Sequence, residues 1–126
     1  LEVQLFVSEI GVQVFVYHAQ RSYYEALLRA GVRIFLYDSP TILHAKHFTI
    51  DDDVSVIGSS NMDMRSFSLD FEISVMVWGG TFLHRLRAIE NEYRENSREL
   101  TLEEWLARPI LSRALDNVAR LTAAVQ

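Results

Sequence analysis

The stretch from His44 to Asn61 restricts the fold of this chain more than any other segment. His44 to Ile50 has the pattern of a strand, Asp51-Asp52-Asp53 that of a turn, and Val54 to Ile57 that of a returning strand. Six residues stand at fixed spacing along this hairpin, in the pattern H-x-K-x4-D-x6-G-S-x-N. The pattern predicts a hairpin with polar side chains at one end.

These residue types suit the binding of a phosphate group. His44 and Lys46 are two apart on a predicted strand, so both side chains leave the same face, about 7 Å apart along it. Gly58 permits a close approach of the backbone, and Ser59 and Asn61 supply neutral hydrogen-bond donors. An imidazole and an ammonium group could therefore reach one phosphate together.

Glu72 follows Asn61 by eleven residues, on the polar side of the next predicted strand. A carboxylate there could accept a hydrogen bond from the other imidazole N–H and fix its tautomer. His47 falls on the face opposite His44, so these two are not expected to form a metal pair. The acidic run 51–53 indicates a solvated turn rather than a calcium site, because no loop of further oxygen ligands follows.

The part of the chain before the hairpin predicts strands and a short helix. We expect strands over Val3–Val7, Val12–Tyr17 and Val32–Tyr37. Ser22 to Glu25 forms a capping box for a helix that Gly31 ends in a left-handed cap. Strands alternating with helices indicate a sheet covered by helices.

After a strand over Leu69–Trp78 the remaining residues predict helices. Thr81 is placed to cap the first of them, and Pro109 suits the first turn of the last. Between them Thr101 to Glu104 forms a second capping box, with Leu100 and Trp105 as its hydrophobic staple. We therefore predict one α/β domain over residues 1–126, a mixed sheet flanked by helices, with a helical tail over 81–126.

Composition narrows the function further. A net charge of −5 argues against a general nucleic-acid binder, and the absence of cysteine excludes disulfides and thiolate metal sites. No apolar run approaches the roughly 20 residues that cross a bilayer, so a membrane anchor is expected outside this sequence. The chain begins at Leu1 rather than methionine and is interpreted as part of a longer protein. Eleven of its twelve basic residues are arginine, and Lys46 is the single lysine.

The hairpin pattern resembles the signature of the phospholipase D superfamily. The segment Asn61 to Phe67, followed by Phe71-Glu72, is similar to the bacterial cardiolipin synthase branch of that superfamily. The similarity continues through Tyr93–Ser97 and Trp105–Pro109, so it covers most of the chain. This sequence departs from the family in carrying one motif where the family has two.

The resemblance implies a site built around one phosphodiester by two motifs, one from each half of the protein. One motif histidine attacks phosphorus and forms a phosphohistidine, while the other protonates the leaving alcohol. The resemblance implies no metal ion and no cofactor.

Carried over to this chain, the resemblance makes His44 the nucleophile or the general acid. It implies that Lys46 and Asn61 bind the phosphate oxygens, that Ser59 assists them, and that Glu72 orients His44. Asp51 matches the aspartate of the motif, and we assign it to the hairpin turn together with the structural Gly58.

The expected activity is transfer of a phosphatidyl group between two phosphatidylglycerol molecules, giving cardiolipin at the bacterial cell membrane. The expected partner is the N-terminal half of the same enzyme or a second copy of this chain, and the isolated chain is expected to be inactive. Two alternatives stay open: a single-motif nuclease or phosphodiesterase that works as a homodimer, and a catalytically silent fragment.

Overall fold

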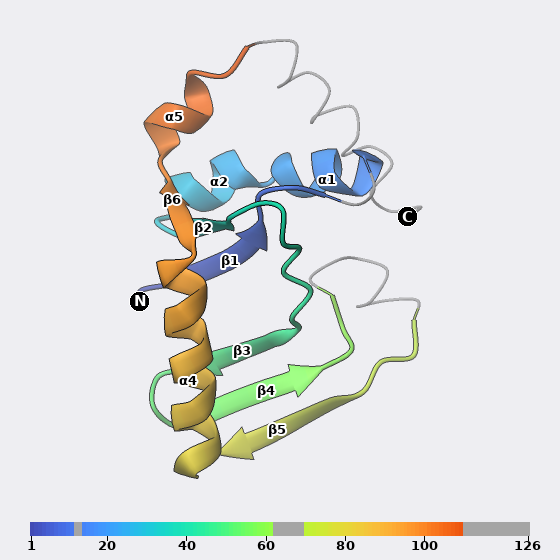
Figure 1. Cartoon of the computed structure of the whole chain (residues 1–126), viewed down its shortest axis with the longest axis vertical. Helices are drawn as coiled ribbons and strands as arrows, with labels where there is room; N and C mark the ends of the chain where they lie inside the picture. Colours follow the sequence, from blue (N-terminus) through green and yellow to red (C-terminus); the bar gives the residue numbers. More distant parts are fainter. Residues whose placement is uncertain (12–13, 62–69, 110–126) are drawn as a thin grey trace. The chain divides into compact units, whose positions relative to one another are not determined.

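A computed structural model describes residues 1–11, 14–61 and 70–109. The chain divides into two compact units, one formed by Leu1–Leu43 with the described residues from Asn96 onward, the other by His44–Glu95. Each unit contains a three-stranded sheet and at least one helix (Figure 1). The predicted α/β class, with parallel and antiparallel strand pairs, is confirmed.

The first unit has a central strand, β2, that is parallel to β1 and antiparallel to β6. Parallel neighbours cannot be joined by a tight turn, and the two helices α1 and α2 form the connection. The elements of this unit are β1 (Gln4–Ser8), α1 (Val14–Arg21), α2 (Tyr24–Arg29), β2 (Arg33–Tyr37), β6 (Ser97–Leu100) and α5 (Leu102–Leu106).

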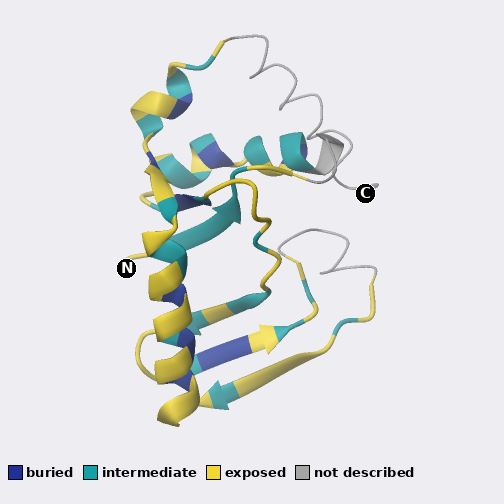
Figure 2. Ribbon diagram, viewed as in Figure 1, coloured by how far each residue is buried: buried dark blue, intermediate teal, exposed yellow. Residues whose placement is uncertain are grey.

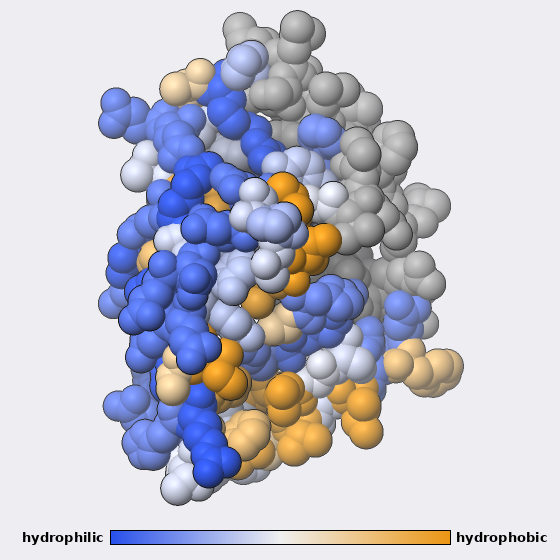
Figure 3. Space-filling model, in the orientation of Figure 1, coloured by the Kyte–Doolittle hydropathy of each residue, from blue (hydrophilic) through white to orange (hydrophobic). Residues whose placement is uncertain are grey.

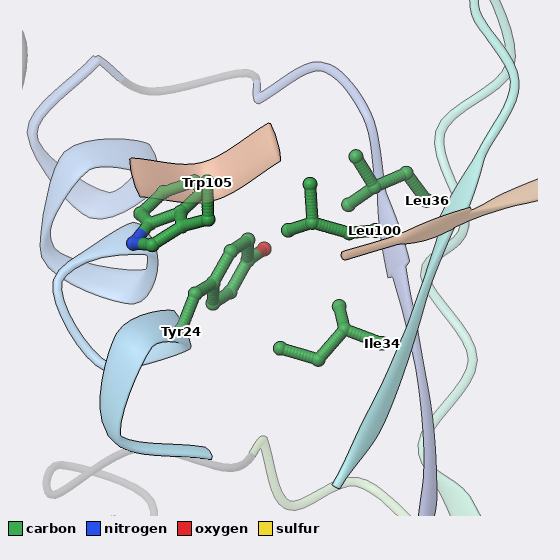
Figure 4. Close-up of a cluster of buried hydrophobic side chains, with 5 residues drawn as sticks. All are labelled: Tyr24, Ile34, Leu36, Leu100 and Trp105. Carbon is green, nitrogen blue, oxygen red and sulfur yellow. The ribbon is translucent and has the colours of Figure 1, made fainter. Parts of the chain in front are cut away.

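One cluster of buried side chains forms the core of the first unit (Figure 4). Ile34 and Leu36 leave the same face of β2, because they are two residues apart on a strand. Helix α2 adds Tyr24, whose ring centroid lies 5.2 Å from that of Trp105 on α5. Leu100 completes the cluster, so both residues of the predicted hydrophobic staple are buried in it.

Two local signals in this unit are confirmed. Gly31 follows α2 with a φ of 86°, the left-handed conformation predicted for the end of that helix. The side chain of Thr101 accepts a hydrogen bond from the backbone N–H of Glu104 at 3.1 Å, as predicted for the second capping box.

The second unit is an antiparallel sheet in the order β3-β4-β5 with α4 packed on one face. Its elements are β3 (His47–Ile50), β4 (Val54–Gly58), β5 (Ser74–Trp78) and α4 (Gly80–Glu95). The buried residues of α4 are Leu83, Leu86 and Glu90. The buried part of this helix lies on its side toward the strands of the sheet (Figure 2). Apolar side chains are exposed over this sheet (Figure 3), and four of them share the face opposite α4: Phe48, Ile50, Met76 and Trp78.

The structure corrects two predictions for the N-terminal part. The strand predicted over Val12–Tyr17 is wrong, because the described residues from Val14 onward form α1. The parallel pairing of β1 and β2 requires a crossover connection between them. This tertiary constraint makes the segment helical although its alternating valines favour a strand. The capping box at Ser22 is also wrong: its hydroxyl donates to a carbonyl of α1 at 2.6 Å, and Tyr23 precedes α2 without a side-chain cap.

Three further boundaries differ from the prediction. The tail is not helical throughout, since β6 interrupts it. The four residues of β6 are too few to show the apolar alternation of a strand, and their pairing with β2 decides their structure. Helix α4 begins at Gly80, so Thr81 lies within it rather than capping it. The strand predicted over Leu69–Trp78 is β5, which begins at Ser74. Residue 69 and the helix predicted after Pro109 lie outside the described residues.

Replacing Thr101 by alanine is expected to lower the free energy of unfolding by about 1 kcal/mol, because the N–H of Glu104 loses its acceptor. Thr81→Ala is the matched control, on a helix residue that is not a cap, with an expected change within about 0.5 kcal/mol. Urea unfolding of both variants measures the difference. Equal losses in the two variants would contradict the capping role.

Candidate phosphate-binding site

The sheet of the second unit gathers three strand ends. Because β4 is antiparallel to both neighbours, the beginning of β3, the end of β4 and the beginning of β5 lie at the same end of the sheet. The predicted site residues flank these ends: His44 and Lys46 before β3, Ser59 and Asn61 after β4, and Glu72 before β5.

His44 and Lys46 lie just before β3, which begins at His47 rather than at His44 as predicted. The carbonyl of Lys46 still accepts a hydrogen bond from the N–H of Gly58 at 3.0 Å, so this segment stays paired with the end of β4. Lys46 Nζ lies 2.9 Å from His44 Nε2. The two side chains therefore point to a common place, as their spacing predicts.

The pair combines a hydrogen-bond acceptor and a cation at one accessible place. An ammonium group only donates, so Nε2 of His44 acts as the acceptor in the contact and carries a lone pair. His44 is exposed and Lys46 is half-buried, so a ligand can reach both. An anionic phosphate oxygen could accept a hydrogen bond from the ammonium group, while the imidazole contacts the phosphorus atom or the leaving oxygen.

Gly58 allows β4 and β5 to approach closely. A Cβ at this position would lie 2.5 Å from the carbonyl oxygen of Ile73 and against the hydroxyl of Ser74. Contacts this short are not tolerated, so any side chain would push the two strands apart. The close pairing of β4 and β5 at this position therefore requires glycine.

Ser59 connects the end of β4 to the segment before β5. Its N–H donates to the carbonyl of Ile73 at 3.0 Å, and its hydroxyl oxygen accepts from the N–H of Ile73 at 3.1 Å. The hydroxyl also donates to the carboxylate of Glu72 in a short hydrogen bond. Ser59 and Glu72, which are thirteen residues apart, are thus held as one group.

The hydrogen bond predicted between Glu72 and His44 is not part of this arrangement. Between these two described residues no bond is formed, since Glu72 is bonded to Ser59 and His44 is in contact with Lys46. The orienting role of Glu72 therefore stays a prediction.

The remaining motif residues are Asp51 and Asn61. Asp51 begins the turn between β3 and β4 with a φ of 47°, in the left-handed region that aspartate tolerates better than most residues. Asn61 is exposed at the end of the described stretch that follows β4.

A buried carboxylate close to the motif escaped the sequence reasoning. Glu90 of α4 accepts hydrogen bonds from the hydroxyl of Thr49 at 2.9 and 3.1 Å. His47 Nε2 lies 3.5 Å and Arg87 Nη1 3.1 Å from the same carboxylate. The sequence signal was an acidic residue in the helical stripe of Leu83 and Leu86, where an apolar residue is expected.

The environment of Glu90 keeps its carboxylate charged. Burial by itself would raise the pKa of Glu90, but hydrogen bonds from His47 and Thr49, together with the charge of Arg87, outweigh burial. The pKa of Glu90 consequently lies below its usual range. A charged, almost fully buried carboxylate thus contacts β3, the strand between Lys46 and Asp51 of the motif.

In the described ranges, no three histidine, aspartate or glutamate side chains are grouped as a metal site would require. Nor does any helix in those ranges combine the length and apolarity needed to span a bilayer.

Known proteins are similar to this sequence over nearly its whole length. A family described as cardiolipin synthase, PLD-like domain, matches residues 1–93. The major cardiolipin synthase ClsA of Bacillus subtilis is 34% identical over 125 residues, 99% of this chain and 26% of that protein. Cardiolipin synthase A of Buchnera aphidicola is 36% identical over 118 residues, 94% of this chain and 24% of that protein. The chain thus spans about a quarter of the length of these relatives.

Gly58→Ala is expected to destabilise the second unit by about 1–3 kcal/mol, because the added methyl group must displace Ile73 and Ser74. Amide NMR signals of these two residues should shift, since Ser59 is bonded to the same segment. Ser60→Ala, which adds no atoms at a nearby position, serves as the control in the same unfolding and NMR measurements. Unchanged signals and stability in Gly58→Ala would show that the strands can separate without cost.

Proposed function

Because this chain belongs to the family of cardiolipin synthase PLD-like domains, we propose that it supplies one half of a phosphatidyl-transfer site. In the proposed reaction, the phosphatidyl group of one phosphatidylglycerol moves to a hydroxyl of another, giving cardiolipin and glycerol. The single observation that carries the proposal is the 2.9 Å contact between His44 Nε2 and Lys46 Nζ. It pairs a nucleophilic nitrogen with a cation at one exposed place.

The proposed reaction has two steps. In the first, an imidazole nitrogen bonds to phosphorus, the bond from phosphorus to the glycerol oxygen breaks, and a second imidazole gives that oxygen a proton. In the second, the hydroxyl of another phosphatidylglycerol attacks phosphorus, its proton passes to the second imidazole, and the nitrogen–phosphorus bond breaks. His44 takes one of these two parts, and the histidine of a second motif takes the other.

The neighbouring residues are assigned supporting parts. Lys46 and Asn61 bind phosphate oxygens, and Ser59 assists them from the end of β4. Glu72 orients His44. For this, the Glu72 carboxylate must give up its hydrogen bond from the Ser59 hydroxyl and accept one from the imidazole N–H when substrate binds. In this scheme the Lys46 ammonium group also gives up its hydrogen bond to His44 and donates to a phosphate oxygen instead.

The second motif belongs to a partner. We propose that it comes from the N-terminal half of the same enzyme or from a second copy of this chain. The relatives are about four times as long as this chain, which leaves room for a second motif and a membrane anchor in the same protein. The proposed location is the bacterial cell membrane, where phosphatidylglycerol is found.

The isolated chain is expected to form no cardiolipin from phosphatidylglycerol vesicles, because one imidazole cannot be both nucleophile and proton donor in the same step. In an active assembly that contains a second motif, His44→Ala should lower the rate at least about 1000-fold. Mass spectrometry of extracted lipids measures the product, with oligomeric state determined on the same sample. His84→Ala, on the exposed side of α4, is the control and should keep full activity.

A strictly monomeric sample of this chain that makes cardiolipin, and loses the activity on His44→Ala, would show that one motif suffices. Activity that survives His44→Ala in the complete assembly would remove His44 from the mechanism. Cleavage of nucleic acid in place of lipid transfer would favour the homodimeric nuclease.

Transfer in the active assembly is expected to persist in excess EDTA, because Lys46, Asn61 and their counterparts meet the phosphate charge. The rate should stay within about twofold of the untreated sample. The control is a phosphodiesterase with a bound divalent metal, treated in parallel. Full loss that only a metal ion restores would contradict this prediction.

A further inference from the structure

Glu90 is a buried carboxylate for which the proposed reaction has no use. It is 8% exposed, on the face of α4 where Leu83 and Leu86 pack onto the sheet. A buried charge costs several kcal/mol unless ions and hydrogen bonds compensate it. An apolar residue would pack α4 onto the sheet without that cost. The packing of the helix therefore does not explain why a carboxylate stands at this position.

Two partners of Glu90, Thr49 and His47, lie in β3, within the motif. Thr49 donates its hydroxyl to both carboxylate oxygens, and His47 Nε2 lies 3.5 Å away, with both ionisable side chains about one tenth exposed. His47 and Thr49 are two apart in β3, so they leave the same face of the strand. Contacts at two successive positions on one face fix the rotation of the strand about its own axis.

The same helix also holds the far end of β3. Arg87 bonds to the carboxylate of Glu90 and donates a short hydrogen bond to the carbonyl of Asp51 in the turn. The ring of Tyr93 lies 5.9 Å from that of His47 at the near end. Side chains of α4 therefore contact β3 at its first residue, at Thr49 and in the turn that follows it.

Fixing the rotation of β3 decides where Lys46 points. Lys46 immediately precedes His47, and its carbonyl is still bonded to Gly58 of β4, so the pairing of the hairpin continues through it. Successive residues of a paired segment point to opposite faces, and a slip or rotation would turn Lys46 and His44 toward α4. The contact of 2.9 Å between Lys46 and His44 depends on both side chains staying on the face that points away from α4.

We propose that Glu90, through Thr49 and His47, is a positioning residue for the His44–Lys46 pair. The proposal rests on the proposed function, since it assigns Glu90 a part in that reaction. Glu90 touches no reacting atom; it acts by holding the strand from which the pair projects.

The test compares Glu90→Gln with Glu92→Gln, an exposed carboxylate two residues away on the same helix. Glutamine keeps the size of Glu90 and an acceptor for Thr49, and it removes the charge that His47 and Arg87 face. The first readout is the ¹⁵N signal of His44 Nε2 in this chain, with Lys46→Ala defining the signal of an imidazole without the ammonium. The second is the kinetics of the active assembly.

We expect Glu90→Gln to move the His44 signal most of the way to that of Lys46→Ala. In the assembly it should lower kcat at least about tenfold with KM changed less than twofold, as for a loss of geometry in the transition state. Glu92→Gln should change neither readout. A lower melting temperature with an unchanged His44 signal and unchanged kcat would show a purely structural role and overturn the proposal.

A second pair of variants decides the matter if Glu90→Gln does not fold. Thr49→Val removes only the hydroxyl that Glu90 accepts from, while Thr49→Ser keeps it. The valine variant should shift the His44 signal in the same direction and the serine variant should not; equal signals would overturn the proposal. Because the NMR readout needs no catalysis, it distinguishes a failure of this proposal from a failure of the proposed transferase function.

Discussion

The antiparallel pairing of β4 with both of its neighbours is the constraint on which the candidate site depends. His44, Ser59 and Glu72 are far apart in sequence, and none of them lies inside a strand. They lie at one end of the sheet because the pairing brings the beginnings of β3 and β5 to the end of β4. Gly58 permits the close approach of β4 and β5, and the hydrogen bonds of Ser59 keep the segment before β5 in place. A change in register at either pairing would separate these groups.

Much of this arrangement could be predicted because its signals are local. The hairpin around Asp51, the left-handed Gly31 and the capping of α5 by Thr101 each depend on residues within a few positions of one another. The spacing of His44 and Lys46 is a signal of the same kind, and the structure brings their side chains into contact. The family resemblance likewise rests on short patterns, chiefly the one from His44 to Asn61.

The errors arise where distant parts of the chain decide the structure. Residues of the predicted strand Val12–Tyr17 form α1 because β1 and β2 are parallel, and β6 is a strand because β2 pairs with it. The hydroxyl of Ser59 competes for Glu72 in a way that strand period does not reveal. The bond between Thr49 and Glu90 joins residues 41 positions apart, so no window of local sequence contains it. The sequence patterns thus predict the motif and the helix after Trp78, but not the hydrogen bond that joins β3 to that helix.

The contact between Lys46 and His44 has a practical consequence for the chemistry of the chain. Lys46 is the single lysine, so it carries the one aliphatic primary amine among the side chains of this sequence. Its half-buried stem directs that amine toward the imidazole of His44. An amine-selective acylating reagent consequently has one side-chain target, while the eleven arginines stay unmodified. A fluorophore or cross-linker attached in this way would report from within contact distance of His44, without engineering of the sequence.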